Sequence, residues 1–143
     1  MDTAWSATSR YPTATTAAAV EAVAAEQYGV ISCPQALKCG LTYHDLRLLV
    51  RKAEWLRPHG RVYAVPFLMP PVGSPERLHC LVMAAQSALR VWSCAAGRTA
   101  ARLWGMQGLV RWDGLEVHLA VPALRARGQL TGVELHGGDV RPE

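Results

Sequence analysis

The sequence predicts an α+β protein in two parts, a helical first half that ends in a β-hairpin and a small α/β lobe. In the first half, two short helix-starting motifs stand close together and precede two runs of β-forming residues. In the second half, one long amphipathic segment precedes several short runs that favour strands. Prolines and glycines gather between positions 66 and 75, so residues 67–74 are expected to link the two parts.

The composition predicts a globular chain rather than a disordered or membrane-spanning one. The 143 residues are 50% hydrophobic and 18% charged, which suits folded domains. No apolar stretch approaches the roughly 18 residues that a membrane span requires. Asp2 follows the first methionine, and Glu21 and Glu26 interrupt the alanine-rich stretch, so a secretory signal is not expected. We therefore predict a cytoplasmic protein without a membrane partner.

Residues 1–15 are predicted to form a flexible arm, because they are rich in serine, threonine and alanine and show no periodicity. Such an arm can enter the minor groove of DNA. Arg10 is its only basic residue, which favours a plain disordered terminus. Apolar residues at helical spacing then predict a helix over residues 17–27, capped by Thr16 and ended by Gly29.

Two helix-capping motifs follow at a short interval. Residues 32–35 have the form S-x-x-Q, with a proline in the first turn, and predict a short helix that Gly40 ends. Residues 42–45 have the form T-x-x-D and open a further helix that runs to about Lys52. Two capped helices joined by Gly40 and Leu41 form a helix-turn-helix.

The helix predicted from residue 42 has two distinct faces. Its apolar stripe, expected to face the core, consists of Leu46, Leu49, Val50 and Ala53. The opposite side carries His44, Arg47, Leu48 and Arg51. Arginine can bond guanine in bidentate fashion, histidine can contact a base edge or a phosphate, and leucine can touch a thymine methyl group. This face therefore fits a recognition helix, and the alternative is an ordinary solvated helix face.

A β-hairpin is predicted next, because residues 54–57 and 61–65 favour strands and residues 58–60 contain the proline and glycine of a turn. A hairpin directly after a helix-turn-helix is a wing, so residues 16–66 are predicted to form a winged helix-turn-helix. Its tip carries Arg57, His59 and Arg61, placed to reach a phosphate backbone or a flanking minor groove. Trp55 and Tyr63 are interpreted as hairpin packing rather than base-stacking groups.

The charge distribution agrees with a polyanionic partner. The chain has 15 basic and 11 acidic residues, which gives a net charge of +4. Six of the basic residues but only two of the acidic ones lie in residues 30–66, so this segment carries the excess. A solvated basic face without a partner is the alternative.

We therefore predict double-stranded DNA as the partner, bound by two groups of residues. The recognition helix contributes Thr42, Tyr43, His44, Arg47, Leu48 and Arg51. The preceding helix and the wing contribute Ser32, Gln35, Lys38, Arg57, His59 and Arg61.

Residues 75–143 are predicted to form the small α/β lobe. Ser74 and Pro75 start a helix whose apolar residues recur at helical spacing up to Leu89. Strands are expected at residues 92–96, 115–121 and 133–136, with a short capped helix at residues 99–104.

The sequence shows no catalytic constellation, so the protein is not expected to be an enzyme. It contains no phosphate-binding loop, no nucleophile elbow and no H-E-x-x-H motif. The histidines of the second half, His79, His118 and His136, are scattered and are interpreted as structural. The four cysteines form no CxxC pair and no zinc-like spacing, so we expect neither a metal nor a cofactor.

Several motifs stand in an order that matches one known family. In the first half they are Gly29-Val30-Ile31-Ser32, Gln35-Ala36, Gly40-Leu41-Thr42, Leu49-Val50-Arg51, Glu54-Trp55-Leu56-Arg57 and Gly60-Arg61-Val62-Tyr63-Ala64-Val65-Pro66. In the second half they are Arg98-Thr99-Ala100-Ala101-Arg102-Leu103-Trp104-Gly105-Met106, Val117-His118-Leu119-Ala120-Val121-Pro122 and Gly132-Val133-Glu134-Leu135-His136. Their order and spacing resemble the AbiEi-type antitoxins of type IV toxin–antitoxin systems over residues 18–140.

The resemblance implies a bacterial repressor that binds inverted repeats in its own promoter through the winged helix. It also implies a second domain that opposes a cognate nucleotidyltransferase-like toxin without forming a stable complex with it. In relatives, further α/β structure follows the segment that corresponds to residues 139–143. The resemblance therefore implies that the second lobe is truncated in this chain.

The predicted function is thus a sequence-specific transcriptional regulator of the AbiEi type. Two alternatives remain: a protein-interaction module, or a remnant of a longer antitoxin that no longer regulates transcription. The strand expected at residues 133–136 leaves an open sheet edge, which a second copy of the chain could pair with. A homodimer on an inverted repeat is therefore expected.

Overall fold

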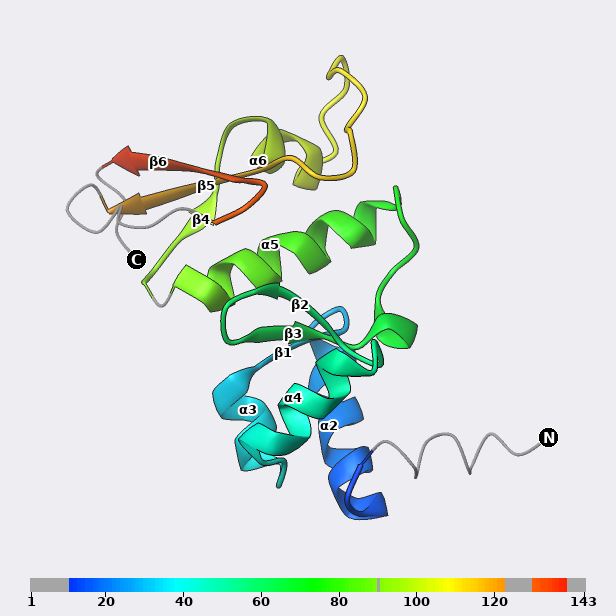
Figure 1. Ribbon diagram of the computed structural model, residues 1–143. Helices are drawn as coiled ribbons and strands as arrows, with labels where there is room; N and C mark the ends of the chain where they lie inside the picture. Colours follow the sequence, from blue (N-terminus) through cyan, green and yellow to red (C-terminus); the bar gives the residue numbers. More distant parts are fainter. Residues whose placement is uncertain (1–10, 90, 123–129, 139–143) are drawn as a thin grey trace. The chain divides into compact units, whose positions relative to one another are not determined.

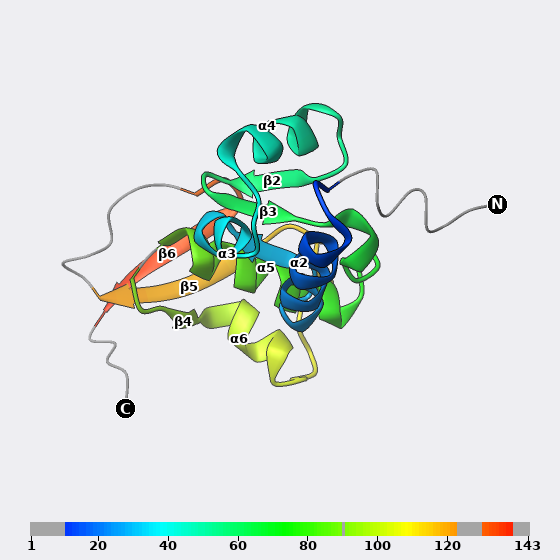
Figure 2. The ribbon, with the colours of Figure 1, turned by 90° about the horizontal axis from the view of Figure 1, so that it is seen from below.

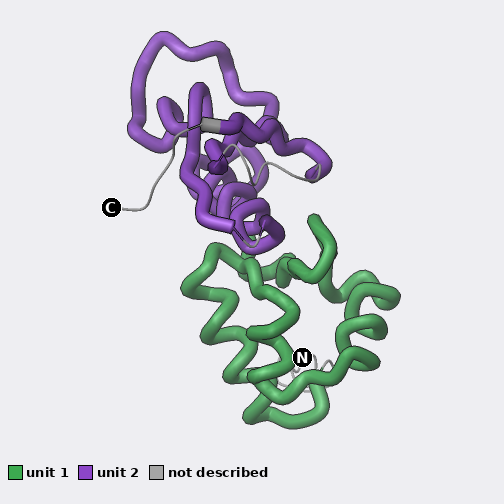
Figure 3. The backbone as a smooth tube through the Cα atoms, turned by 90° about the vertical axis from the view of Figure 1, so that its left-hand side faces the viewer, with its two compact units in different colours: residues 1–69 green, residues 70–143 purple. Residues whose placement is uncertain are grey.

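The computed structural model describes residues 11–89, 91–122 and 130–138. The chain divides into two compact units, residues 1–69 and residues 70–143, which Figure 3 draws in green and purple. Within the described residues there are five α-helices and two three-stranded sheets, one sheet in each unit. The predicted α+β class is confirmed.

The first unit contains three α-helices, three strands and one 3-10 helix (Figure 1). In chain order they are α2 (Ala14–Glu26), β1 (Val30–Ser32), α3 (Cys33–Lys38), α4 (Tyr43–Arg51), β2 (Leu56–His59), β3 (Val62–Ala64) and η1 (Pro66–Leu68). The sheet is antiparallel throughout, in the order β1-β3-β2. Figures 1 and 2 both show α4 lying along the β2–β3 hairpin.

Helix α2 begins three residues earlier than predicted. Thr13 is its N-cap, and the Thr13 hydroxyl oxygen accepts a hydrogen bond from the backbone N–H of Thr16 at 3.0 Å. The predicted cap at Thr16 is therefore wrong. Both threonines can cap a helix, and the intervening residues are compatible with the first turn, so the local pattern alone did not distinguish them.

The predicted arm of residues 1–15 also ends earlier, because Tyr11 belongs to the core of the first unit. Its side chain is buried, with 5% of the residue exposed, and its hydroxyl oxygen accepts a hydrogen bond from Trp55 Nε1 at 3.1 Å. The rest of the predicted arm, residues 1–10, lies outside the described residues.

The turn between α2 and β1 requires a glycine. Gly29 has a φ of +89°, and its N–H donates to the carbonyl of Ala24 at 2.7 Å. A Cβ atom at this position would lie 2.9 Å from the backbone nitrogen of Met69. The close approach of two backbone segments, in addition to the left-handed φ, therefore excludes larger residues.

Trp55 lies at the centre of the first core. Its ring stands 6.1 Å from the ring of Tyr11 and 5.8 Å from that of Tyr63, measured between centroids. Trp55 is 1% exposed and Tyr63 is 9% exposed, as the packing interpretation predicts. The other fully buried large side chains of this unit are Val20, Val30, Ile31, Leu46, Val62 and Val65.

The second unit contains α5 (Pro75–Leu89), β4 (Cys94–Ala95), α6 (Gly97–Leu103), β5 (Val117–Pro122) and β6 (Val133–Gly138). The sheet order is β4-β5-β6, with β4 antiparallel and β6 parallel to β5. Helix α5 covers one face of this sheet. Its side chains Leu78, Val82 and Ala85 form a core cluster with Val117 and Leu119 of β5. The helix predicted at residues 99–104 begins at Gly97 instead, and its N-cap, Ala96, makes no side-chain hydrogen bond.

No helix in the described segments is long and apolar enough to cross a membrane.

We predict that Tyr11→Phe lowers the free energy of unfolding by about 1–3 kcal/mol, because the buried Trp55 indole N–H loses its acceptor. Urea unfolding of the full chain measures this change. The control is Tyr43→Phe, which alters an exposed tyrosine and should stay within about 0.5 kcal/mol of the parent. A Tyr11→Phe variant as stable as the parent would show that the first core does not depend on this contact.

Candidate nucleic-acid interface

Reciprocal hydrogen bonds cap the start of α4. The Thr42 hydroxyl oxygen accepts from the backbone N–H of Asp45 at 3.1 Å, and the Asp45 carboxylate accepts from the backbone N–H of Thr42 at 2.8 Å. The predicted capping box is confirmed. It sets where α4 begins, and with it the direction of every side chain along the helix.

A second capping box opens α3 and occupies two of the predicted DNA-contacting side chains. The backbone N–H of Gln35 donates to Ser32 Oγ at 3.3 Å, and that of Ser32 donates to Gln35 Oε1 at 2.9 Å. The Gln35 amide also exchanges two hydrogen bonds with the Gln27 amide, at 2.9 and 3.0 Å. Ser32 and Gln35 therefore hold the start of α3 in place, whereas Lys38 is exposed in its last turn.

The inner face of α4 packs on the core as predicted, except at its end. Leu46 and Leu49 are buried, and Val50 packs against the same core. The prediction for Ala53 is wrong, because the helix ends at Arg51 and Ala53 is exposed with a φ of 57°. Ala53 takes the left-handed position that closes the helix, so that the chain can turn into the hairpin.

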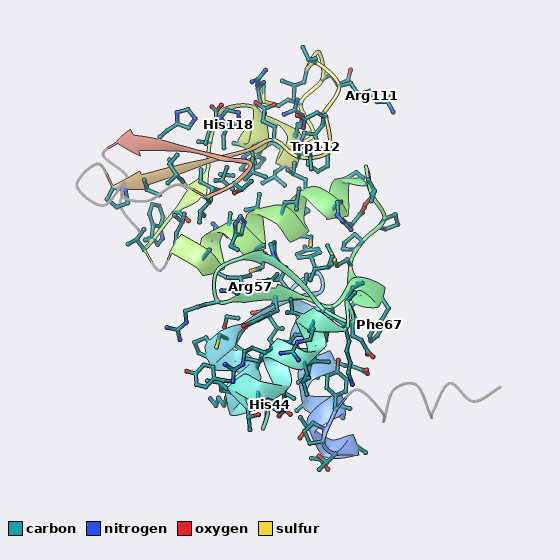
Figure 4. All side chains as sticks on the ribbon, viewed as in Figure 1. His44, Arg57, Phe67, Arg111, Trp112 and His118 are labelled. Atoms are coloured by element: carbon teal, nitrogen blue, oxygen red, sulfur yellow. The ribbon has the colours of Figure 1, made fainter. Side chains whose placement is uncertain are left out.

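The outer face of α4 is basic and exposed. Its exposed side chains are Thr42, Tyr43, His44, Arg47 and Arg51. His44 projects from the first turn of the helix (Figure 4). This face gathers the predicted recognition residues, apart from Leu48, on one surface of the first unit.

Leu48 differs from the expectation of an exposed leucine. It is partly buried and lines a hollow of about 290 Å³ together with Tyr11 and Lys52. Tyr11 approaches this side of α4 because the chain before α2 folds back onto the core. Part of the Leu48 side chain remains accessible for an apolar contact.

Three arginines surround a second hollow, of about 270 Å³, which we call the arginine hollow. Arg47 and Arg51 come from α4, Arg57 comes from β2, and Tyr63 lines the hollow beside them. Among the residues that the structure describes, none of these arginines pairs with a carboxylate. Burial raises the pKa of the Tyr63 hydroxyl, although Arg57 acts in the opposite direction, so the phenol stays protonated at neutral pH. The arginine hollow is therefore a concave surface with three positive charges that no carboxylate in the described part of the chain neutralises.

The hairpin is tighter than the sequence predicts. Its first strand extends to His59, so the turn is Gly60 and Arg61 rather than residues 58–60. Pro58 is accommodated because β2 is an edge strand and the pairing is irregular between Leu56 and His59. Arg61 has a φ of 64°, and its carbonyl oxygen accepts from the first backbone N–H of α3 at 2.8 Å.

The three side chains predicted for the hairpin tip differ in exposure. Arg57 and Arg61 are exposed, whereas His59 is partly buried. Burial lowers the pKa of His59, so its imidazole is neutral at physiological pH. The positive charge of the hairpin comes from its two arginines.

The second unit holds a polar cluster that the sequence interpretation missed. The parallel pairing of β5 with β6 places His118 opposite Glu134, with His136 two residues further along β6. His118 Nδ1 lies 2.9 Å from His136 Nε2 and 3.3 Å from Glu134 Oε2, and His118 Nε2 contacts the Glu116 carboxylate. The interpretation of His118 and His136 as scattered residues is therefore wrong. We call Glu116, His118, Glu134 and His136 the histidine–carboxylate cluster.

One sequence signal could have found this cluster. Glu116 and His118, and again Glu134 and His136, form the same E-x-H pattern at the start of two strands. Alternate residues of a strand share one face, so each pattern directs both of its side chains to the same side of the sheet. Glu116 also forms an ion pair with Arg98. The His118 hydrogen bond, followed by the Arg98 charge, holds the pKa of Glu116 below its usual range.

A pocket of about 530 Å³ also lies in the second unit, between the start of α5 and the segment that follows α6. Its lining is largely apolar, with Leu78, Leu103 and Trp112, and includes His79 and Arg102. Arg102 Nη2 donates to the Val110 carbonyl at 3.0 Å, which holds the segment after α6.

Comparison of the chain with protein-family models, with curated proteins and with solved structures finds no match.

We predict that the free energy of unfolding decreases as the pH falls below about 6.5, the ordinary pKa of histidine, because of His59. The folded state disfavours the charged imidazolium, so the unfolded state binds the proton more tightly. The contribution of His59 is complete above about pH 6.5 and is lost as the pH falls through the lowered pKa of the folded state.

The measurement is urea unfolding between about pH 7.5 and about pH 5.5, a window that spans the histidine titration. His59→Gln should flatten the pH dependence of the free energy of unfolding. An unchanged pH dependence in His59→Gln would contradict this assignment.

Proposed function

We propose that the first unit is a winged helix-turn-helix that binds duplex DNA sequence-specifically and regulates transcription. The observation that carries this proposal is the arginine hollow, where α4 and the hairpin present three guanidinium groups that pair with no carboxylate of the described residues. In this proposal α4 is the recognition helix, and the β2–β3 hairpin is the wing.

The chemistry of the exposed groups supports DNA over other polyanions. A guanidinium group on a helix can reach guanine O6 and N7 in the major groove, which is the commonest specific contact of this kind. Arg47 and Arg51 stand one helical turn apart on the exposed face of α4, so both can follow the same groove. Arg57 and Arg61 on the hairpin would then contact the phosphate backbone and set the orientation on the duplex.

No carboxylate of the described residues forms an ion pair with these arginines, which also supports the proposal. Cations that are available for phosphates provide the electrostatic part of DNA affinity. In the described part of α4 the acidic side chain is Asp45, which is engaged in the capping box. The Asp45 carboxylate keeps its charge, but the capping contact holds it at the first turn of the helix, and it forms no ion pair with these arginines among the described residues.

The more specific form of the proposal is an AbiEi-type autorepressor that binds an inverted repeat in its own promoter. The order of motifs across both units supports it. A cognate toxin, opposed without a stable complex, belongs to the same proposal. A protein-interaction module is the other candidate, but an interaction face of that kind usually carries a larger apolar patch than the basic outer face of α4.

We predict that the full chain binds DNA from the region upstream of its own gene, with an affinity that falls steeply as salt rises. Each neutralised phosphate contributes about −0.9 to the slope of log K against log salt. Arg47→Ala and Arg51→Ala should each cost about 1–3 kcal/mol on the cognate site and relax its sequence preference, because they remove base contacts. Arg61→Ala should weaken binding to all sequences equally and reduce the salt slope by about 1.

Fluorescence anisotropy with cognate and scrambled duplexes measures these effects. The control is Arg111→Ala, which removes the same charge from an exposed position of the second unit and should leave affinity unchanged (Figure 4). A flat salt response, or equal losses for all four variants on both duplexes, would refute sequence-specific binding through α4.

We also predict a dimer, because β6 pairs within the described residues only with β5 and leaves its other edge open. Pairing of this edge with a second copy would give a two-fold assembly that matches an inverted repeat. Sedimentation equilibrium at tens of micromolar should show the dimer. A monomer, together with non-cooperative binding to a half-site, would contradict it.

A further inference from the structure

The histidine–carboxylate cluster is built by long-range pairing in the second unit. Two E-x-H patterns, one at each of two parallel strands, bring two imidazoles and two carboxylates together. The ring planes of His118 and His136 are within 21° of each other, and their facing nitrogen atoms are 2.9 Å apart. The apolar residues of the same strands face α5, so the cluster occupies the opposite face of the sheet.

The contact with Glu116 determines which His118 nitrogen carries a proton. A carboxylate paired with an arginine can only accept a hydrogen bond, so His118 Nε2 must be the donor to Glu116. In the neutral imidazole, Nδ1 then carries the lone pair. His136 Nε2 and Glu134 Oε2 lie 2.9 and 3.3 Å from this nitrogen.

Three potential metal-ligand atoms therefore lie close together. His118 Nδ1, His136 Nε2 and a Glu134 carboxylate oxygen all lie within 4.8 Å of one another. His136 Nε2 either carries a proton and donates it to His118 Nδ1, or carries a lone pair and, with the other two atoms, can bind a cation. We propose that these three atoms bind a divalent transition metal, with Zn²⁺ as the natural ion, through His118, Glu134 and His136.

The distances fit such an ion with small side-chain movements. Zinc bonds imidazole nitrogen at about 2.0–2.1 Å, so tetrahedral ligands stand about 3.3 Å apart. Two of the separations here are 2.9 and 3.3 Å. Glu134 and His136 are exposed and can adjust, whereas His118 is buried and fixed.

The surroundings of His118 match the support that metal-binding histidines receive. Such a histidine usually donates its second ring N–H to a carboxylate, which orients the ring and raises its basicity. Glu116 is in this position, and Arg98 holds Glu116 from the other side. The backbone N–H of His118 also donates to Thr99 Oγ1 at 2.8 Å, which anchors the strand beside α6.

The ligand types select the metal. Two imidazoles and one carboxylate suit Zn²⁺ and similar transition metals, whereas Mg²⁺ and Ca²⁺ prefer oxygen ligands alone. Three protein ligands leave a fourth position for water. This site departs from the expectation of no metal, which relied on cysteine spacing, and it is independent of the DNA-binding proposal.

The test is a zinc titration of the metal-free full chain in competition with a chromophoric chelator. One equivalent of Zn²⁺ should bind and should raise the melting temperature of the chain. Glu134→Gln and His136→Ala, at exposed positions that should not impair folding, are each expected to weaken zinc affinity more than tenfold. Glu116→Ala should weaken it by about 10- to 100-fold, the usual effect of an outer-shell partner. The control, His79→Ala, removes an exposed histidine of the same unit and should bind zinc as the parent does.

Cobalt provides the second readout. A Co²⁺ complex of the parent chain should show visible bands of a four-coordinate site without thiolate charge-transfer absorption, which excludes the four free cysteines as ligands. The proposal is overturned if the parent binds no zinc, if Glu134→Gln and His136→Ala bind it as tightly as the parent, or if thiolate bands are present. The first of these results would show that a hydrogen bond between His136 Nε2 and His118 Nδ1, rather than a metal, joins the two imidazoles.

Discussion

The burial of Trp55 is the interaction on which the candidate interface depends. The backbone N–H groups of Glu54 and Trp55 both donate to the carbonyl of Leu49, at 2.9 and 3.1 Å, so the tryptophan directly follows the closed end of α4. Its ring then packs against Tyr63 of β3 and Tyr11 of the segment before α2. Truncating a buried tryptophan typically costs about 3–5 kcal/mol, whereas an exposed ion pair contributes about 0.2–1 kcal/mol. The core, rather than surface charge, therefore sets the position of the hairpin beside α4.

Because the core, and not surface charge, positions the hairpin, the three arginines of the hollow do not have to form ion pairs within the described part of the chain. Trp55 and the residues around it pack α4 against β3, and β2 is held by its pairing with β3, whereas no ion pair of Arg47, Arg51 or Arg57 occurs among the described residues. Three cations around one hollow repel each other. Replacing them with neutral residues would therefore cost little folding stability if no ligand bound there. A polyanionic ligand relieves this repulsion, and the rigid support of the core limits the entropy lost when it binds.

Local motifs could be predicted from the sequence, whereas long-range pairings could not. The capping box at Gln35 depends on residues three positions apart, so its pattern is visible in the chain. The sequence does not single out Thr13 as the cap, because several threonines compete there. It predicts a turn at Pro58, because the tolerance of a strand for proline depends on its place at the sheet edge. The contact between His118 and His136 depends on the register of two parallel strands, and this register cannot be predicted from the local sequence pattern.

Hydrogen–deuterium exchange of the full chain, with and without duplex DNA at low salt, tests the central claim most directly. If α4 and the hairpin bind DNA, exchange should slow at residues 42–51 and 56–63, and the Arg47→Ala variant should lose most of that protection. Protection confined to residues 70–143, or no protection at any position, would contradict the account.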